Sequence, residues 1–170
     1  EKLKKHMRCL FTYGGMYLVC NSNLLYHASV PLNEDGSFKH VNICGKEYWG
    51  KNLLDKIDQL IRTAYFDEDD EEEKRFAMDY IWYLWCGPDA PSFDKDKMAT
   101  FERYFIADKS LHKETKGYYY ALRNKEEICD RILEEFGVTG QHTHIINGHV
   151  PVKTIKGEQP MKAGGKLLVI

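Results

Sequence analysis

Two histidines that lie far apart in the sequence occupy the same kind of position. His27 follows the apolar run Leu24-Leu25-Tyr26, and His149 follows a run that contains Ile145-Ile146. A turn that ends in proline comes after each histidine. In open α/β sheets, ligands bind in the loops beyond the carboxyl ends of strands, where an imidazole on a stiff strand can bind a metal ion. The shared context predicts a metal site that uses His27 and His149, although each histidine alone also fits an ordinary surface or core position.

Two more histidines precede His149, and the sequence leaves their role open. His142 and His144 flank Thr143, so in a strand they would point to the same face. They could be two further ligands, but we favour partly exposed histidines at the start of a strand. A zinc or manganese site needs more than two ligands, and the sequence contains no H-E-x-x-H motif, no D-x-H motif and no cysteine pair. The residues alone therefore leave the metal site incomplete.

The composition is that of a single globular domain. The chain has 170 residues, of which 43% are hydrophobic and 29% are charged, which is enough apolar material for a proper core. The net charge of -2 gives no overall field that would attract nucleic acid or an anionic membrane. The five cysteines are scattered, which argues against a disulfide framework and fits a reducing cytoplasm. No long apolar run or signal peptide is recognised, so we expect neither membrane spanning nor secretion.

The two ends of the sequence are unusual for a natural domain. The chain begins without methionine and stops on the apolar segment Leu167–Ile170. Domains rarely end on so apolar a segment, so we expect a part of a longer protein. A truncated sheet would then expose an unpaired strand edge near Leu167–Ile170, where association or aggregation can start.

Strand signals dominate the first forty residues. Met7–Tyr13 and Met16–Cys20 read as two strands of a hairpin joined by Gly14-Gly15. Asn21-Ser22-Asn23 is a second turn signal, after which Leu24-Leu25-Tyr26 reads as a short strand that carries His27 at its carboxyl end.

The middle of the sequence changes to helical periodicity. Apolar residues recur on one helix face from Leu53 to Tyr65, and again from Phe76 to Trp85 up to Gly87-Pro88. The acidic run Asp67–Glu73 reads as a solvated loop and helix entry, because acidic residues complement a helix N-terminus. Asn124 and Glu127 form a predicted capping box for a third helix that ends at Gly137. Trp82 and Trp85 are expected in the core.

The last thirty residues return to strands, at His142–Ile146 and Lys166–Ile170. The order of strands, helices and strands predicts an α/β (α+β) fold with a sheet core and a helical insert over one edge. We expect one partial domain with three parts: core strands with the first metal histidine at 1–38, a mainly helical insert and substrate region at 39–139, and core strands with the second metal histidine at 140–170.

Four segments carry a resemblance to a known family. The segments "CNSNLLYHASVPLNEDGSF", "MDYIWYLWCGPDAPSFDKDKMATFERYFIADKSLHKETKGYYY", "ILEEFGV" and "HIINGHVPVKTIKGEQPMKAGGKLLVI" resemble class III (Firmicutes-type) fructose-1,6-bisphosphatase, a bacterial member of the calcineurin-like metallophosphatases. The resemblance runs along nearly the whole chain. It implies part of a calcineurin-like metallophosphatase sheet core, preceded in the full protein by the segments that supply most of the metal ligands.

The resemblance assigns roles to the two histidines. His27 and His149 would bind one metal of a two-metal site, with Mn2+ as the implied cofactor and no catalytic residue within this chain. Where many metallophosphatases have Gly-His-x-His, this chain has Gly148-His149-Val150-Pro151, so the other metal would take its ligands from the missing N-terminal part.

Two positions depart from the family pattern. Ala28 stands where glycine is usual, and a small residue there still allows close packing near the metal. Asp94 replaces glycine within Ala90–Lys95, where it would add negative charge if that loop lies beside an anionic substrate.

The implied activity is hydrolysis of the 1-phosphate of fructose 1,6-bisphosphate to fructose 6-phosphate, a step of gluconeogenesis, in the cytoplasm. The substrate would need cations for its two phosphates. Arg103 is our first candidate because a guanidinium can bind phosphate oxygens in a bidentate way. The other candidates, in and beside the same segment, are Lys95, Lys109, His112 and Lys113. An ordinary solvated helix face is the alternative for Arg103.

Other functions remain open at this point. A phosphoprotein phosphatase or a dinucleoside polyphosphate hydrolase would use the same metals, and a non-catalytic module is a further alternative. The chain on its own is expected to be inactive and to bind Mn2+ weakly, and a homo-oligomer is possible.

Overall fold

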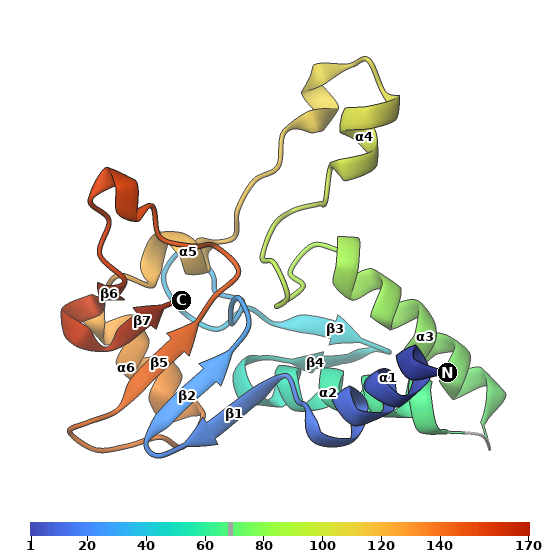
Figure 1. The fold of residues 1–170 in the computed structure, drawn as a ribbon, viewed down its shortest axis with the longest axis horizontal. Helices are drawn as coiled ribbons and strands as arrows, with labels where there is room; N and C mark the ends of the chain where they lie inside the picture. Colours follow the sequence, from blue (N-terminus) through green and yellow to red (C-terminus); the bar gives the residue numbers. More distant parts are fainter. Residues whose placement is uncertain (68–69) are drawn as a thin grey trace.

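The main sheet combines parallel and antiparallel strands. In this computed structural model, which describes residues 1–67 and 70–170, strands form a five-stranded sheet of order β1-β2-β5-β7-β6 and a separate two-stranded sheet, β3-β4 (Figure 1). The strands of the larger sheet are β1 (Tyr17–Cys20), β2 (Asn23–Tyr26), β5 (His144–Asn147), β6 (Met161–Lys162) and β7 (Leu167–Val169). The β2-β5 and β5-β7 pairs are parallel, whereas β1-β2 and β6-β7 are antiparallel. The small sheet pairs β3 (Val41–Ile43) with β4 (Lys46–Tyr48). The fold is therefore mixed α/β.

Helices cover one face of the main sheet and form a second layer beside it. The α-helices are α1 (Lys2–Tyr13), α2 (Gly50–Phe66), α3 (Glu71–Cys86), α4 (Thr100–Phe105), α5 (Tyr118–Leu122) and α6 (Glu126–Glu135). Short 3-10 turns are η1 (Lys109–His112), η2 (Thr154–Lys156) and η3 (Ala163–Gly165). In Figure 1, α6 lies behind β2 and β5, while α2 and α3 pack together beside the sheet. No described helix is long and apolar enough to cross a lipid bilayer.

Two apolar clusters make up the core. The first joins the buried side chains of β2, β5 and β7 to α5 and α6; among its members are Leu24, Tyr119, Ile132, Ile145 and Leu167. The second lies between α2, α3 and the small sheet; among its members are Ile43, Ile57, Leu60, Ala77 and Phe93. Leu53 and Leu54, neighbours on α2, belong to different clusters, so α2 connects the two cores.

The helical periodicity predicted α2, α3 and α6. Leu53, Ile57 and Leu60 of α2 are buried on one face, and the predicted face of α6 is buried through Ile128 and Ile132. The capping box was wrong, because α6 begins at Glu126 with Lys125 as its N-cap and no side-chain cap bond. Helix α3 ends before Gly87 as expected. Within the acidic run, Asp70 accepts hydrogen bonds from the N–H groups of Glu72 and Glu73, while residues 68–69 lie outside the described residues.

The predicted hairpin at the N-terminus is wrong, because residues 2–13 form α1. The real hairpin comes later and joins β1 to β2 through Asn21 and Ser22. The guanidinium of Arg62 on α2 donates to the carbonyl oxygens of Phe11 and Gly14 at 2.6 and 2.9 Å. The last carbonyl groups of a helix lack partners within the helix, so this tertiary contact stabilises α1. A local strand pattern cannot reveal such a contact.

Two further expectations about exposure are wrong. Trp82 and Trp85 are 65% and 69% exposed, because the buried face of α3 is formed instead by Ala77 and Leu84. The strand at Leu167–Val169 is not an unpaired edge, because β7 lies between β5 and β6.

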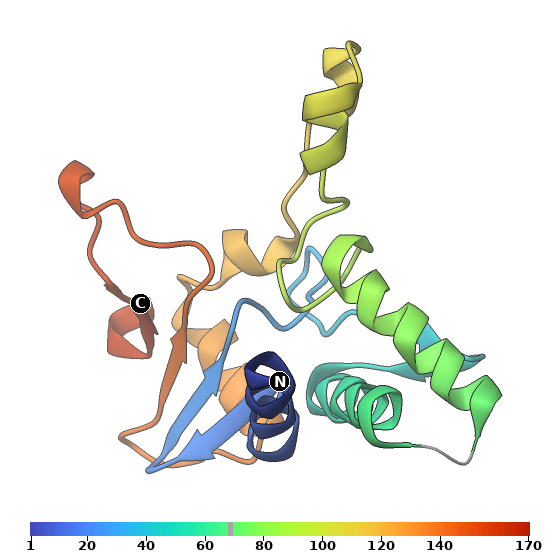
Figure 2. The same cartoon turned by 45° about the vertical axis from the view of Figure 1, so that its right-hand side comes forward.

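The segment from residue 96 to residue 115, named the arm here, stands away from both layers (Figure 2). It contains α4 and η1. Backbone hydrogen bonds close its base, where Asp96 N–H donates to the carbonyl of Thr115 at 2.9 Å. Its aromatic side chains Tyr104 and Phe105 are 80% and 81% exposed.

Asp94, just before the arm, is a buried acid without a full set of partners. Its residue is 3% exposed, its Oδ2 has no hydrogen bond among the described residues, and its φ is 51°. Gly117 packs against the carboxyl group so closely that a Cβ there would lie 2.1 Å from Oδ1. Burial, followed by the nearby charge of Asp89, raises the pKa of Asp94 to about 6. The ionised carboxylate therefore destabilises the folded state.

Replacing Asp94 by asparagine is expected to stabilise the protein at neutral pH. When folding raises the pKa of an acid, the protonated acid does not lower the free energy of unfolding. That free energy falls as pH rises from the pKa of the unfolded state to the pKa of the folded state, because the buried group must then ionise. The difference between D94N and wild type should therefore grow between about pH 4 and pH 6, to about 2–3 kcal/mol at pH 7. Urea unfolding across pH measures it. Asp35→Asn is the matched control with the opposite sign, because hydrogen bonds from Ser37 lower the pKa of Asp35. A D94N difference independent of pH would contradict this account.

The packing of the two layers predicts unequal effects of two truncations. Ile132→Ala removes a side chain that is 1% exposed and should cost about 2–5 kcal/mol of unfolding free energy. Trp82→Ala removes a larger but mostly exposed side chain and should change it by about 0.5 kcal/mol or less. Urea unfolding of the 170-residue chain gives both values. A loss in W82A as large as that in I132A would mean that Trp82 is buried.

Candidate functional site

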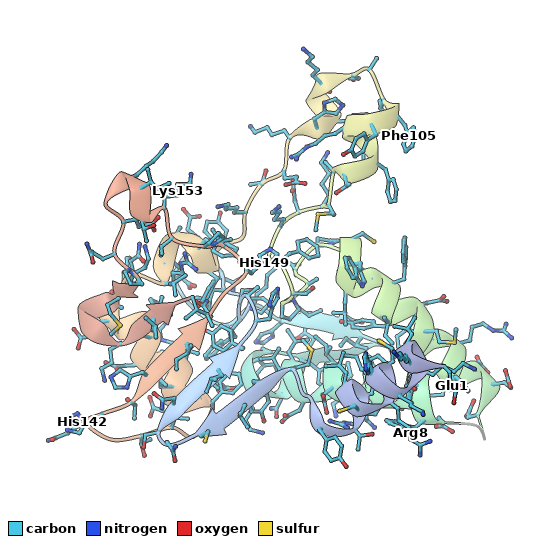
Figure 3. The ribbon with its side chains drawn as sticks, in the orientation of Figure 1. Glu1, Arg8, Phe105, His142, His149 and Lys153 are labelled. Atoms are coloured by element: carbon cyan, nitrogen blue, oxygen red, sulfur yellow. The ribbon has the colours of Figure 1, made fainter. Side chains whose placement is uncertain are left out.

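His27 and His149 meet at the carboxyl end of the main sheet. The parallel register of β2 and β5 sets Tyr26 opposite Asn147, so the chain leaves both strands at the same edge. The Nε2 atom of His27 and the Nδ1 atom of His149 form a hydrogen bond of 3.1 Å. The ring centroids are 5.1 Å apart with an interplanar angle of 71°, and both residues are exposed. The predicted convergence of these two side chains is thus present, at the site labelled by His149 in Figure 3.

Backbone geometry holds the second histidine in place. Gly148 N–H donates to the carbonyl oxygen of His27 at 2.9 Å, which extends the β2-β5 pairing by one step. Val150 N–H then donates to the carbonyl of Gly148 at 2.7 Å and turns the chain. His149 has a φ of 62°, a left-handed conformation that costs a residue other than glycine about 1 kcal/mol or more. The fold therefore maintains this orientation against a local strain.

A buried hydrogen-bond network lies under the histidine pair. Asn147 Nδ2 donates to the carbonyl of Ala28 at 2.9 Å and to the hydroxyl of Tyr119 at 2.6 Å. The hydroxyl groups of Tyr119 and Tyr26 are 2.8 Å apart. These bonds connect the last residues of β2 and β5 to α5. His27 and His149 follow those strand ends. Buried polar groups that are bonded in this way specify one arrangement of the strands that carry them.

The charges around His149 favour its neutral form. Although His149 is exposed, neighbouring atoms remove part of the hydration of its ring, which lowers its pKa, and the positive charges of His27, Lys95 and Lys116 lower the pKa further. A neutral imidazole has a free lone pair on one ring nitrogen, which is the form that binds a metal ion.

Lys116 was not among the residues predicted from the sequence. It pairs with Lys95 in an isolated antiparallel bridge at the base of the arm. The neighbouring Gly117 N–H donates to the carbonyl of Asp94 at 2.8 Å, which fixes this strand beside loop 90–94. Gly117, whose missing Cβ permits that approach, was a usable sequence signal for a close contact.

The other two histidines lie at the opposite end of β5. His144 is the first residue of β5 and is half-buried, while His142 is exposed in the preceding turn. Figure 3 shows His142 far from His149. Within residues 1–67 and 70–170, no group of three or more His, Cys, Asp or Glu side chains is placed to hold a metal ion. The described chain therefore presents a pair of imidazoles, and not a complete set of metal ligands.

The pair nevertheless has the spacing of two ligands on one ion. Two nitrogen ligands, each at about 2.1 Å from an ion, lie about 3.0–3.4 Å from each other at tetrahedral or octahedral angles. The measured 3.1 Å between His27 Nε2 and His149 Nδ1 falls in this range. The donor set of two imidazoles thus fits a divalent transition metal.

The five predicted phosphate-binding side chains lie in or beside the arm. Lys95 and Arg103 both contact Glu114, with Lys95 Nζ at 2.8 Å and Arg103 Nη2 at 3.4 Å from Oε2. Arg103 Nη2 also donates to the carbonyl of His112 at 3.3 Å, and His112 Nε2 lies 2.8 Å from the carbonyl oxygen of Ile106. Lys109 and Lys113 are exposed. Of these residues, Lys95 is the one whose charge acts on His149.

A hollow lies on the open face of the main sheet. Its volume is about 800 Å³, and its walls come from β1, α2 and the loop at Pro91. His27 stands at its margin, and apolar residues such as Leu18, Leu25 and Ile146 line it. This face of the sheet is not covered by α5 or α6.

Comparison with known proteins gives consistent matches. The family described as Firmicute fructose-1,6-bisphosphatase matches residues 1–170. The chain is 81% identical to the fructose-1,6-bisphosphatase class 3 of Bacteroides thetaiotaomicron, 68% identical to that of Phocaeicola vulgatus and 59% identical to that of Clostridium tetani, each over 170 residues.

The matches cover all of this chain but only 26% of each of these relatives. No solved structure matches the chain. A family match over every residue, together with relatives of this identity, establishes the assignment: the chain belongs to the Firmicute fructose-1,6-bisphosphatase family.

Proposed function

We propose that this chain supplies two metal ligands, His27 and His149, to the active site of a fructose-1,6-bisphosphatase. The observation that carries the proposal is the 3.1 Å approach of their ring nitrogens from two parallel strands. The family membership and the printed name of the relatives, fructose-1,6-bisphosphatase class 3, support this substrate. The reaction is hydrolysis of the 1-phosphate of fructose 1,6-bisphosphate.

The metal site that we propose holds two ions, with Mn2+ as the cofactor. When bound, such ions would lower the pKa of a water molecule and neutralise charge on the phosphate oxygens. His27 and His149 would hold one ion as neutral imidazoles, a form that the charges of Lys95 and Lys116 favour in His149. The network of Asn147 and Tyr119 fixes the strand ends that carry both rings. The remaining ligands would come from other parts of the protein, because the chain spans about a quarter of its relatives' length.

Calcineurin-like architecture and a cytoplasmic location belong to the same proposal. His27 and His149 follow the carboxyl ends of two parallel strands, an arrangement that suits such a core. The five cysteines are free, and four of them are exposed, which suits a reducing compartment.

Substrate preference tests the proposed activity. The full-length protein with Mn2+ should hydrolyse fructose 1,6-bisphosphate with a higher kcat/KM than a phosphoserine peptide or a dinucleoside polyphosphate. Released phosphate measures all three reactions. If one of the other two substrates is preferred, a different metallophosphatase activity replaces this one.

Metal content tests the role of the two histidines separately from activity. In the full-length protein, His27→Ala and His149→Ala should each weaken Mn2+ binding by about 100-fold or more, because a lost ligand weakens binding at least as much as a lost ligand-orienting contact. Equilibrium dialysis with elemental analysis gives the affinity and the number of ions per chain.

His142→Ala is the matched control, since His142 lies at the other end of β5 and should leave Mn2+ binding unchanged. The 170-residue chain alone should bind Mn2+ weakly and show no phosphatase activity. Unchanged Mn2+ affinity in both H27A and H149A would remove the basis of the proposed site.

A further inference from the structure

Arg123, just after α5, is a buried cation without a counterion. The residue is 6% exposed, and its Nη1 atom has neither solvent contact nor a hydrogen-bond partner. In the described part of the chain, no ion pair or side-chain hydrogen bond of Arg123 is found. A guanidinium remains charged at all physiological pH values, and a buried unpaired charge costs several kcal/mol. An anion from outside the described chain would remove this cost.

Two acids lie in the region of Arg123, and neither forms an ion pair with it among the described residues. Both carboxylate oxygens of Glu158 are occupied, one by Lys162 Nζ and the other by the N–H of Lys153 at 2.9 Å. Asp94 and Arg123 both act on Tyr120, because Asp94 raises the pKa of Tyr120 and Arg123 lowers it. The Oδ2 atom of Asp94 nevertheless has no hydrogen-bond partner among the described residues. Arg123 is therefore held near acids that it does not bind.

A second cation shares the same aromatic ring. Arg123 Cζ lies 5.2 Å from the centroid of Tyr120, and Lys116 Nζ lies 5.3 Å from it. The Tyr120 hydroxyl donates to the carbonyl of Phe93 at 3.2 Å, which fixes the ring beside loop 90–94. Lys116 is exposed and forms no salt bridge with a described residue, so its charge is also available. Two unpaired cations thus lie around one fixed ring.

This cluster is close to the histidine pair. Lys116 is one of the charges that act on His149, and α5 places Arg123 one turn after Tyr119, whose hydroxyl binds Asn147. The histidine pair and the cluster of Lys116, Tyr120 and Arg123 are therefore neighbouring parts of one region. A ligand with two anionic groups suits such an arrangement better than a ligand with one.

We infer that Lys116 and Arg123, positioned on Tyr120, bind the phosphate group of the sugar bisphosphate that is not hydrolysed. This inference rests on the proposed function and adds the residues that would distinguish a bisphosphate from a monophosphate. A guanidinium donates two parallel hydrogen bonds to phosphate oxygens, and the lysine adds a second charge. The phosphate that reacts is left to the metal site of His27 and His149.

Two substrates and two variants of the full-length enzyme test the inference. Lys116→Met and Arg123→Lys should each raise KM for fructose 1,6-bisphosphate by about 10- to 100-fold, as expected for a lost charge-assisted hydrogen bond. Each should lower kcat/KM for fructose 1,6-bisphosphate much more than kcat/KM for p-nitrophenyl phosphate, which has no second phosphate. Arg75→Met is the matched control, because Arg75 is an exposed cation on α3, and it should change neither substrate's constants.

A binding measurement separates this inference from the proposed function. Fructose 6-phosphate retains the phosphate in question, so calorimetry on the metal-free protein should show weaker binding to K116M and R123K than to wild type. If that weakening is seen while fructose 1,6-bisphosphate is not a substrate, the subsite stands and the proposed reaction fails.

If both variants bind fructose 6-phosphate like wild type, or lose activity on both substrates equally, the subsite is wrong. Equal loss would mean that the two cations are structural, or that Arg123 pairs with an acid elsewhere in the protein. Should R123K fail to fold, K116M decides the question, because Lys116 is exposed.

Discussion

The parallel pairing of β2 with β5 is the interaction on which the site depends. It sets Tyr26 beside Asn147 and continues through the bond from Gly148 N–H to the carbonyl of His27. Side chains of a strand alternate between its two faces, so a shift by one residue would turn every side chain of one strand to the other face. Asn147 would then leave Tyr119, and His149 would leave His27. The buried apolar residues Leu24 and Ile145 fix the register, and the register in turn fixes the distance between the imidazoles.

The region around the histidine pair is polar beneath its surface. Three side-chain atoms of the described residues are buried without a partner: Asp94 Oδ2, Arg123 Nη1 and Asn147 Oδ1. Nearly all buried polar groups in proteins have hydrogen bonds, so unpaired ones in one region indicate a function or a missing partner. Tyr120 lies near both Asp94 and Arg123. The strained backbone of His149 belongs to the same region, which agrees with the general concentration of strain at functional sites.

The sequence predicted those features that local patterns determine. The 3.6-residue periodicity located α2 and α6, and the apolar runs before His27 and His149 located β2 and β5. Features that depend on tertiary contacts were missed. Gly14-Gly15 imitates a hairpin turn, but α1 is held by Arg62 from another helix. Trp85 has the spacing of a buried face, yet α3 rotates it outwards because the smaller Ala77 and Leu84 fill the contact with α2. Lys116 and Arg123 belong to no recognisable sequence motif. They lie together only because both pack against the ring of Tyr120 and because α5 is partly buried.

His27 and His149 are separated by 122 positions, and this separation has a kinetic consequence. Parallel strands so distant along the chain can pair only after a long loop has been closed, a step whose entropy cost precedes the gain from the contacts. The helices between the strands shorten that loop as they form, so β2 and β5 pair after these helices. The two imidazoles therefore come together late in folding. Nascent or partly folded chains therefore lack the two-nitrogen arrangement, and the close approach of the two rings reports that the native topology has been reached.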